Sequence, residues 1–124
     1  MILVIMRMKV ISEKRLELSQ AIVSLTDSIR AKKGCRSCDF CQSFENENEL
    51  CLIEEWDNLE NFRAHLKSEL FKVVRGAMNL LEEPCDGLFY TVLHLEGLVE
   101  LMDGFWQQKR SRNEPVHNHI YKED

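Results

Sequence analysis

The feature that most constrains the fold is the order of strand-like and helix-like segments along the chain. Residues 2 to 11 are almost continuously apolar, which predicts a mostly buried strand. Ser12 then suits a helix N-cap. Apolar residues recur after it at helical spacing: Leu18, Ile22, Leu25 and Ile29. These signals predict a helix over about 12 to 33, followed by Gly34 in the left-handed position after its last turn.

The following segments favour a strand hairpin, a helical stretch and one more strand. Strands are expected over about 35 to 46 and over 50 to 56, with the polar run ENENE as the turn between them. Asp57, with a glutamate three residues later, predicts a helix start, and Ser68 predicts a second one. The last strand is expected over 87 to 97.

This order predicts an α+β fold of the ferredoxin-like, split-βαβ type. It has one antiparallel four-stranded sheet with helices on one face. The other face would be bare and apolar, so a homodimer is expected to cover it. We expect residues 1–97 to form this domain. Residues 98–124 would be a C-terminal extension, a short helix and a polar tail, that docks through Phe105 and Trp106.

Composition and charge exclude several classes of partner. The net charge of −5 argues against nucleic acid, whose phosphates require clustered Lys and Arg. No apolar run approaches the roughly 20 residues of a membrane span, so no membrane partner is expected. The apolar start lacks the features of an export signal, which favours a cytoplasmic protein whose five cysteines are reduced.

Three evenly spaced cysteines, Cys35, Cys38 and Cys41, raise the question of a metal site. In one extended strand the outer two would lie roughly 20 Å apart, and Cys38 would point to the opposite face. A single zinc needs all its sulfur ligands within about 2.3 Å. We therefore expect no metal here, with Cys38 in the core and the others half-buried. The HNH run at 117–119 offers too few ligands and is not expected to bind metal either.

The stretch LIEEWDNLENFRAHLKSELFKVV, residues 52 to 74, resembles the antibiotic biosynthesis monooxygenase family, which includes quinol monooxygenases and heme-degrading enzymes. The similar features are a strand ending in E-x-W or E-W, a polar turn, and a helix with an aromatic residue and HL before S-x-x-F. The GC pair at 34–35 also matches. The resemblance covers about 1–97 and implies a dimeric α+β barrel, in which two subunits pack their bare sheet faces together.

The resemblance also implies site residues. Trp56 would line a pocket, with Phe62 as a further substrate-binding ring. His65 would be the catalytic base, and Arg75 would hold a phenolate or enolate oxygen through charge-assisted hydrogen bonds. Each residue also has an ordinary alternative role. Trp56 or Phe62 would then be a core aromatic residue, His65 a surface histidine, and Arg75 a solvated charge on a helix.

Arg7 is a further candidate for substrate binding, because it interrupts an apolar strand. A buried charge needs a partner, and Glu54 or Glu55 is the expected one. Heme-degrading relatives use an Asn, a Trp and an axial His. The matching positions here are Arg7, His65 and Arg75, so the axial ligand is missing and heme breakdown is not expected.

No flavin, nicotinamide or phosphate-binding motif is present in the sequence, so no cofactor is expected. The resemblance implies a cofactor-independent monooxygenase that combines a small quinol-like or aromatic ligand with O2. Two alternatives remain: an isomerase that forms an enolate, and a non-catalytic ligand-binding or stress-related dimer.

Overall fold

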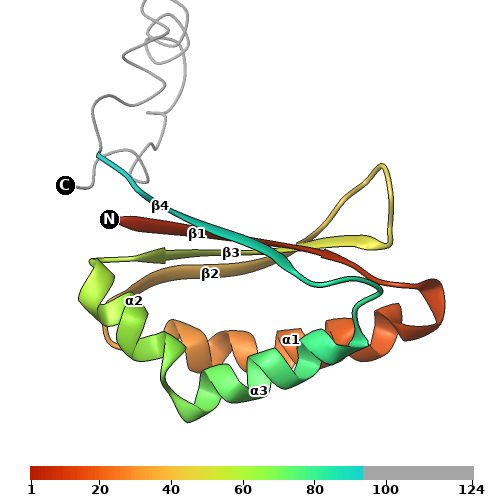
Figure 1. The fold of residues 1–124 in the computed structure, drawn as a ribbon, viewed down its shortest axis with the longest axis horizontal. Helices are drawn as coiled ribbons and strands as arrows, with labels where there is room; N and C mark the ends of the chain where they lie inside the picture. The colour runs from red at the N-terminus through yellow and green to blue at the C-terminus, as the bar shows by residue number, and fades with distance from the viewer. Residues whose placement is uncertain (94–124) are drawn as a thin grey trace, which may run out of the picture. The chain divides into compact units, whose positions relative to one another are not determined.

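The computed structural model describes residues 1–93, and residues 1–91 form one compact unit. Its elements, shown in Figure 1, are β1 (Ile2–Lys9), α1 (Ser12–Arg30), β2 (Cys35–Gln42), β3 (Glu49–Trp56), α2 (Leu59–Leu66), α3 (Glu69–Ala77), a short 3-10 turn (Met78–Leu80) and β4 (Asp86–Thr91).

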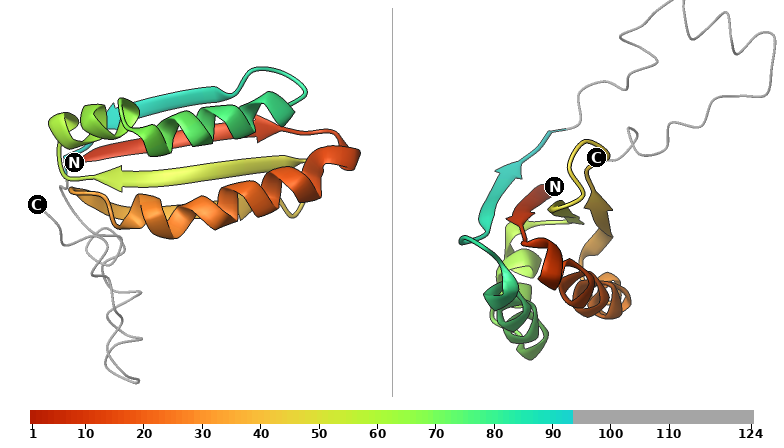
Figure 2. Two further views of the ribbon diagram at one scale, coloured as in Figure 1. Left: turned by 90° about the horizontal axis from the view of Figure 1, so that it is seen from below. Right: turned by 90° about the vertical axis from the view of Figure 1, so that its right-hand side faces the viewer.

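The four strands form one sheet in the order β2-β3-β1-β4, and every neighbouring pair is antiparallel. Two views at right angles show the helices side by side on one face of this sheet (Figure 2). The predicted α+β, ferredoxin-like architecture is therefore confirmed. None of the described helices is long and apolar enough to cross a membrane.

The core lies between the sheet and the helices. Alternate residues of β1 and β3 face the helices, because successive strand side chains point to opposite sides. The buried apolar residues are Ile2, Val4, Met8, Val10, Leu18, Ile22, Ile29, Cys38, Leu50, Leu52, Trp56, Phe62 and Val74. Full burial of each large side chain among them contributes roughly 1.5–3 kcal/mol.

Some of the predicted helix and strand boundaries differ from those in the structure. α1 ends at Arg30 with Ala31 as its C-cap, so Gly34 is not the residue directly after the helix. It lies instead in the turn into β2 with φ of 83°, and its carbonyl accepts a hydrogen bond from the Asp57 backbone at 2.8 Å. The end of the last predicted strand, the predicted domain boundary at 97/98 and the predictions for Phe105, Trp106 and residues 117–119 lie outside the described residues.

A β-bulge near the start of β2 corrects the prediction for the cysteines. Cys35 is opposite Trp56, whereas Ser37 is opposite the preceding residue of β3, so Arg36 is an extra residue in β2. This insertion turns Cys35 to the helix-facing side, the side that Cys38 also occupies. Cys41 alone of the three faces the other way.

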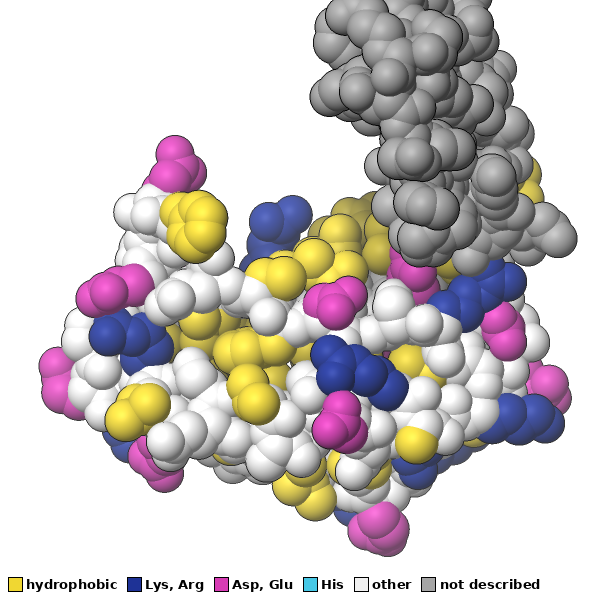
Figure 3. All heavy atoms as spheres, turned by 180° about the vertical axis from the view of Figure 1, so that it is seen from behind, with side chains coloured by type: hydrophobic (Ala, Val, Ile, Leu, Met, Phe, Trp, Pro, Cys, Tyr) yellow, Lys and Arg dark blue, Asp and Glu magenta, His cyan; other side chains and the backbone are white. Residues whose placement is uncertain are grey.

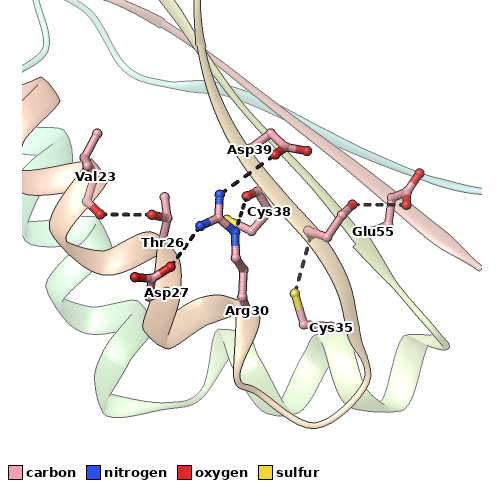
Figure 4. Close-up of polar contacts among 9 residues, drawn as sticks. Val23, Thr26, Asp27, Arg30, Cys35, Cys38, Asp39 and Glu55 are labelled. Carbon is pink, nitrogen blue, oxygen red and sulfur yellow. Dashed lines mark hydrogen bonds and ion pairs between the residues drawn. The ribbon is translucent and has the colours of Figure 1, made fainter. Parts of the chain in front are cut away.

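Arg30, in the last turn of α1, fixes the strand just beyond this bulge. Its Nε donates to the Cys38 carbonyl at 2.9 Å, and its guanidinium pairs with Asp27 at 2.9 Å and with Asp39 at 3.9 Å (Figure 4). The helix end and β2 are thereby held together beside the buried Cys38.

The outer face of the sheet, away from the helices, has an apolar centre with charged residues around it. Its apolar side chains are Leu3, Ile5, Ile53, Leu88 and Tyr90, and Figure 3 shows hydrophobic side chains along this side of the sheet. Arg7 lies on the same face, between Cys51 and Asp86, and is exposed. The expected burial of Arg7 beside Glu54 or Glu55 is therefore wrong, because its position in β1 points away from the core.

Candidate functional site

A cavity of about 170 Å³ lies between the inner face of the sheet and helices α2 and α3. It is lined by Val4, Met6, Glu54, Phe62, Leu66, Phe71, Gly87, Leu88 and Phe89. Three strands supply its floor and two helices its wall. All of the lining except Glu54 is apolar or glycine, so one carboxyl group is the polar side chain that a ligand would meet.

Glu54 is only 2% exposed, although glutamate is rarely buried. One of its carboxylate oxygens accepts a hydrogen bond from the Trp56 indole Nε1 at 2.8 Å. The two side chains meet because they are two residues apart on β3 and so face the same side. Burial raises the pKa of Glu54 above its usual value, and the indole hydrogen bond opposes that rise.

Aromatic rings surround this carboxyl group. The Phe62 ring is 5.4 Å from the Phe89 ring and 6.2 Å from the Trp56 ring, measured between centroids. Phe62 is carried by α2, whose N-cap Asn58 accepts a hydrogen bond from the backbone of Asn61 at 2.8 Å. The predicted cap at Asp57 is thus displaced by one residue.

Helix α3 supplies the remaining ring, Phe71. As predicted, Ser68 is its N-cap and accepts a hydrogen bond from the Phe71 backbone at 3.2 Å. The Ser68 hydroxyl also donates to the carbonyl of His65 at 2.6 Å. This serine therefore joins the end of α2 to the start of α3 and fixes the ring at the cavity wall.

His65 is 2% exposed and lies behind the aromatic rings. It stacks on Trp56 with centroids 4.7 Å apart and meets the edge of Phe71 at 5.4 Å. Neither ring nitrogen has a hydrogen-bond partner among the described residues. Burial, with a smaller effect from the charge of Lys32, lowers the pKa of His65 to about 4. The imidazole is therefore neutral at pH 7.

The lining places His65 outside the cavity. It borders instead a smaller hollow of about 140 Å³, together with Lys32, Lys33, Trp56, Asn61 and Ala64. Trp56 connects this histidine to Glu54, because its ring stacks on His65 and its indole N–H donates to the Glu54 carboxylate. His65 thus supports the rings that form the site.

The two arginines proposed from the sequence also lie apart from the cavity. Arg75 is exposed on α3, with its guanidinium carbon 5.9 Å from the centroid of the Phe71 ring. Arg7 is on the opposite face of the sheet. The structure therefore brings together Trp56, Phe62 and His65, and it leaves Arg7 and Arg75 outside this group.

Sequence reasoning missed Glu54 as a site residue and treated it only as a partner for Arg7. The available signal was its spacing, because an acidic residue two positions before a buried Trp56 in a strand must share its face. Phe71 and Phe89 were missed as well, and the helical spacing of Phe71 gave only a core assignment.

The arrangement can hold an aromatic ring against its apolar lining and accept a hydrogen bond or a proton from a hydroxyl group on that ring. Glu54 offers an acceptor in surroundings where an unpaired charge is costly, which favours a neutral ligand that carries a hydroxyl group. Within residues 1–93, no three His, Cys, Asp or Glu side chains are grouped so that they could hold a metal ion.

Comparison with solved structures shows the same fold in several proteins. A candidate antibiotic biosynthesis monooxygenase from Nitrosomonas europaea is 20% identical, with a TM-score of 0.70 over 75% of this chain and 99% of that one. A conserved protein from Methanosarcina mazei Go1 is 25% identical, with a TM-score of 0.70 over 74% and 92%. The protein Rv0793 from Mycobacterium tuberculosis is also 25% identical, with a TM-score of 0.68 over 74% and 94%.

No curated protein sequence matches this chain. The family model for antibiotic biosynthesis monooxygenases, however, matches residues 1–77, which is more than half of the 124 residues and includes all elements from β1 to α3. The matched region contributes Glu54, Trp56, Phe62, His65 and Phe71. The chain belongs to the antibiotic biosynthesis monooxygenase family.

Proposed function

We propose that this protein is a cofactor-independent monooxygenase that oxidises a small quinol-like or other aromatic substrate with O2. The observation that carries the proposal is the apolar cavity with one buried carboxyl group, Glu54, held by the indole of Trp56. Family membership supports the reaction class.

The size of the cavity suits a single aromatic ring. An apolar cavity of about 150 Å³ in another protein binds benzene, and the volume here is about 170 Å³. Phe62, Phe71 and Phe89 offer ring faces and edges for offset or edge-to-face packing with such a substrate. A bicyclic substrate would have to extend out of the cavity.

Glu54 is the proposed proton acceptor, in place of His65. A phenol held against Glu54 would transfer its proton to the carboxylate, and the resulting electron-rich phenolate would be oxidised by O2. For a hydroquinone, the products are a hydroxylated quinone and one water. One oxygen atom enters the ring and the other leaves as water, and the substrate supplies all four electrons. Burial, which raises the pKa of Glu54, makes it a stronger base than an exposed carboxylate.

Oxygen uptake with a panel of hydroquinones, followed by identification of the products, tests this proposal. We expect Glu54→Gln to lower turnover by roughly 10²- to 10⁴-fold, the usual contribution of general acid–base catalysis. The matched control is Glu55→Gln. That neighbour points to the outer face and accepts a hydrogen bond from Ser37 at 3.0 Å, so its loss should leave turnover unchanged.

Other outcomes distinguish the alternatives. Proton exchange on a carbonyl substrate without oxygen uptake would indicate an enolate-forming isomerase that uses the same carboxylate. Tight binding of a small aromatic without either reaction would indicate a ligand-binding protein. Equal oxygen uptake by Glu54→Gln and the wild type would contradict the proposed role of this residue.

A further inference from the structure

The hollow beside His65 is a second polar site, which the proposed reaction does not use. It has a volume of about 140 Å³ and is lined by Lys32, Lys33, Trp56, Asn61, Ala64 and His65. These residues belong to the turn after α1, the end of β3 and helix α2. The predicted dimer would cover the opposite face of the sheet and leave this hollow open to solvent. We propose that it binds a short-chain monocarboxylate, whose carboxylate group bridges His65 and Lys32.

His65 is the side chain that points to a ligand. It is 2% exposed, and neither of its ring nitrogens has a hydrogen-bond partner among the described residues. Buried polar atoms are almost always paired, because an unpaired one loses its bonds to water and gains nothing in return. The neutral imidazole carries one N–H. A carboxylate oxygen in the hollow would accept that N–H and remove the cost of burying it.

Two lysines on the more exposed side of the hollow favour an anion. Lys32 is half-buried and Lys33 is exposed, and neither forms an ion pair with a described residue. Burial lowers the pKa of His65 and the charge of Lys32 lowers it further, so the two groups lie near each other. Asp57, just after β3, pairs with Arg36 at 2.6 Å and leaves the lysines unneutralised. A carboxylate would therefore meet a cation on one side and an N–H donor on the other.

Gly34 holds the turn that carries the lysines against α2. Its φ of 83° is a left-handed conformation that favours glycine. A Cβ atom at this position would collide with the side chain of Asn61 on α2. Glycine thus permits the close approach that places Lys32 and Lys33 beside the helix of His65.

The rest of the lining restricts the remainder of the ligand. Trp56 and Ala64 offer apolar surface for a hydrocarbon chain, which inorganic phosphate lacks. The volume is slightly below that of a cavity of about 150 Å³ that binds benzene in another protein, so only a short chain fits. The larger cavity has no cation in its lining, and Glu54 there would repel an anion. The two sites therefore select different ligands, a neutral hydroxylated ring and a small anion.

The experiment is an NMR titration of the full chain with butyrate at neutral pH and constant ionic strength, which follows the imidazole nitrogen signals of His65. These signals are assigned by their absence from His65→Phe. We expect a saturable shift with a roughly millimolar Kd, because a ligand of only a few non-hydrogen atoms makes few contacts. Isothermal titration calorimetry measures the same affinity independently of the histidine signals.

Two comparisons test the charge. Lys32→Gln should weaken butyrate binding by roughly tenfold or more, the equivalent of one hydrogen bond to a charged group. The matched control is Lys14→Gln, which removes the same charge at the opposite end of α1 and should leave the affinity unchanged. The ligand 1-butanol keeps the chain without the charge and should bind more weakly than butyrate.

Three results would overturn the proposal. The first is the absence of a saturable shift with butyrate, which would mean that the hollow holds only water. The second is the same affinity in Lys32→Gln and Lys14→Gln, and the third is the same affinity for butyrate as for inorganic phosphate or 1-butanol. Circular dichroism of the variants establishes that they are folded before their affinities are compared.

Discussion

Glu54 and Trp56 are a coupled pair, and neither would be stable in its position alone. A buried carboxyl group without a partner costs free energy, and so does a buried indole N–H. Their 2.8 Å hydrogen bond satisfies both in a region where each is almost fully buried. The pair thus makes a polar group tolerable at the floor of an apolar cavity.

The first prediction concerns the pH dependence of Glu54. Because its pKa is raised in the folded state, the folded protein binds its proton more tightly than the unfolded chain does. Stability should therefore fall as the pH rises above the ordinary value of 4.5, until Glu54 is fully ionised. Glu54→Gln keeps a hydrogen-bond acceptor for Trp56 but cannot ionise, so the stability of this variant should not show the same decrease with rising pH. Urea denaturation of both proteins across pH measures the difference; parallel curves would contradict the shift.

The second prediction has the opposite sign and concerns His65. Its pKa of about 4 lies below the ordinary 6.5, so acid favours the unfolded chain. Stability should fall as the pH drops from 6.5 to about 4, by up to roughly 3 kcal/mol. His65→Phe retains a ring that packs against Trp56 but has no group that titrates, so its stability should not show this loss between pH 6.5 and 4. The same urea series measures this, and a variant as acid-sensitive as the wild type would refute it.

Individual residues also show how far sequence reasoning reached. Trp56 and Phe62 could be singled out because a tryptophan at a strand end and an aromatic residue in the next helix match the family resemblance, and their roles in substrate binding stay predictions. Arg7 was misjudged because position in a strand, not the company of apolar neighbours, decides which face a side chain occupies. The spacing of Glu54 and Trp56 places both on one face of β3, but their hydrogen bond and the cavity beside Glu54 are seen only in the folded structure.

At the scale of elements, the caps decide how α2 and α3 are placed. The type and order of the strands and α-helices followed from hydrophobic patterning together with turn and capping residues, whereas the 3-10 turn at Met78–Leu80 was not predicted. The caps themselves depend on single hydrogen bonds. Ser68 was identified correctly, and Asn58 replaced Asp57 because Asp57 pairs instead with Arg36 at 2.6 Å. The alternation of apolar and polar residues in the β2 sequence does not indicate the bulge at Arg36.

The third prediction tests the cap of α3. Ser68→Ala removes the acceptor for the Phe71 backbone and should destabilise the protein by about 1 kcal/mol. Thermal denaturation should show a melting temperature lower by several degrees. The matched control is Ser24→Ala, whose exposed hydroxyl donates only to the preceding turn of α1, to Ala21. Equal melting temperatures for the two variants would contradict the role of the cap.

At the scale of the whole molecule, the outer face of the sheet is notable for the apolar side chains that it leaves exposed to solvent. Leu88 and Tyr90 are 53% and 46% exposed there, beside Leu3, Ile5 and Ile53. Apolar patches of this kind mark interaction sites. The dimer inferred from the sequence uses this face and stays a prediction.

The fourth prediction is that the protein is a homodimer in solution at micromolar concentration. Ile53→Asp places a charge at the centre of the outer face and should give monomers, while Val73→Asp, on the exposed side of α3, should leave the dimer intact. Sedimentation velocity distinguishes the two states. A wild-type chain that sediments as a monomer at all concentrations would refute the prediction.

Trp56 is hydrogen-bonded to the carboxyl group of Glu54 and stacked on the imidazole of His65, and this arrangement has an optical consequence. Indole emission responds to nearby charge and polarity, and this ring is fully buried between Glu54 and His65. The chain has only two tryptophans, so Trp106→Phe would leave Trp56 as the single emitter. Its fluorescence would then record a ligand entering the cavity, or a proton reaching the imidazole, without any added label.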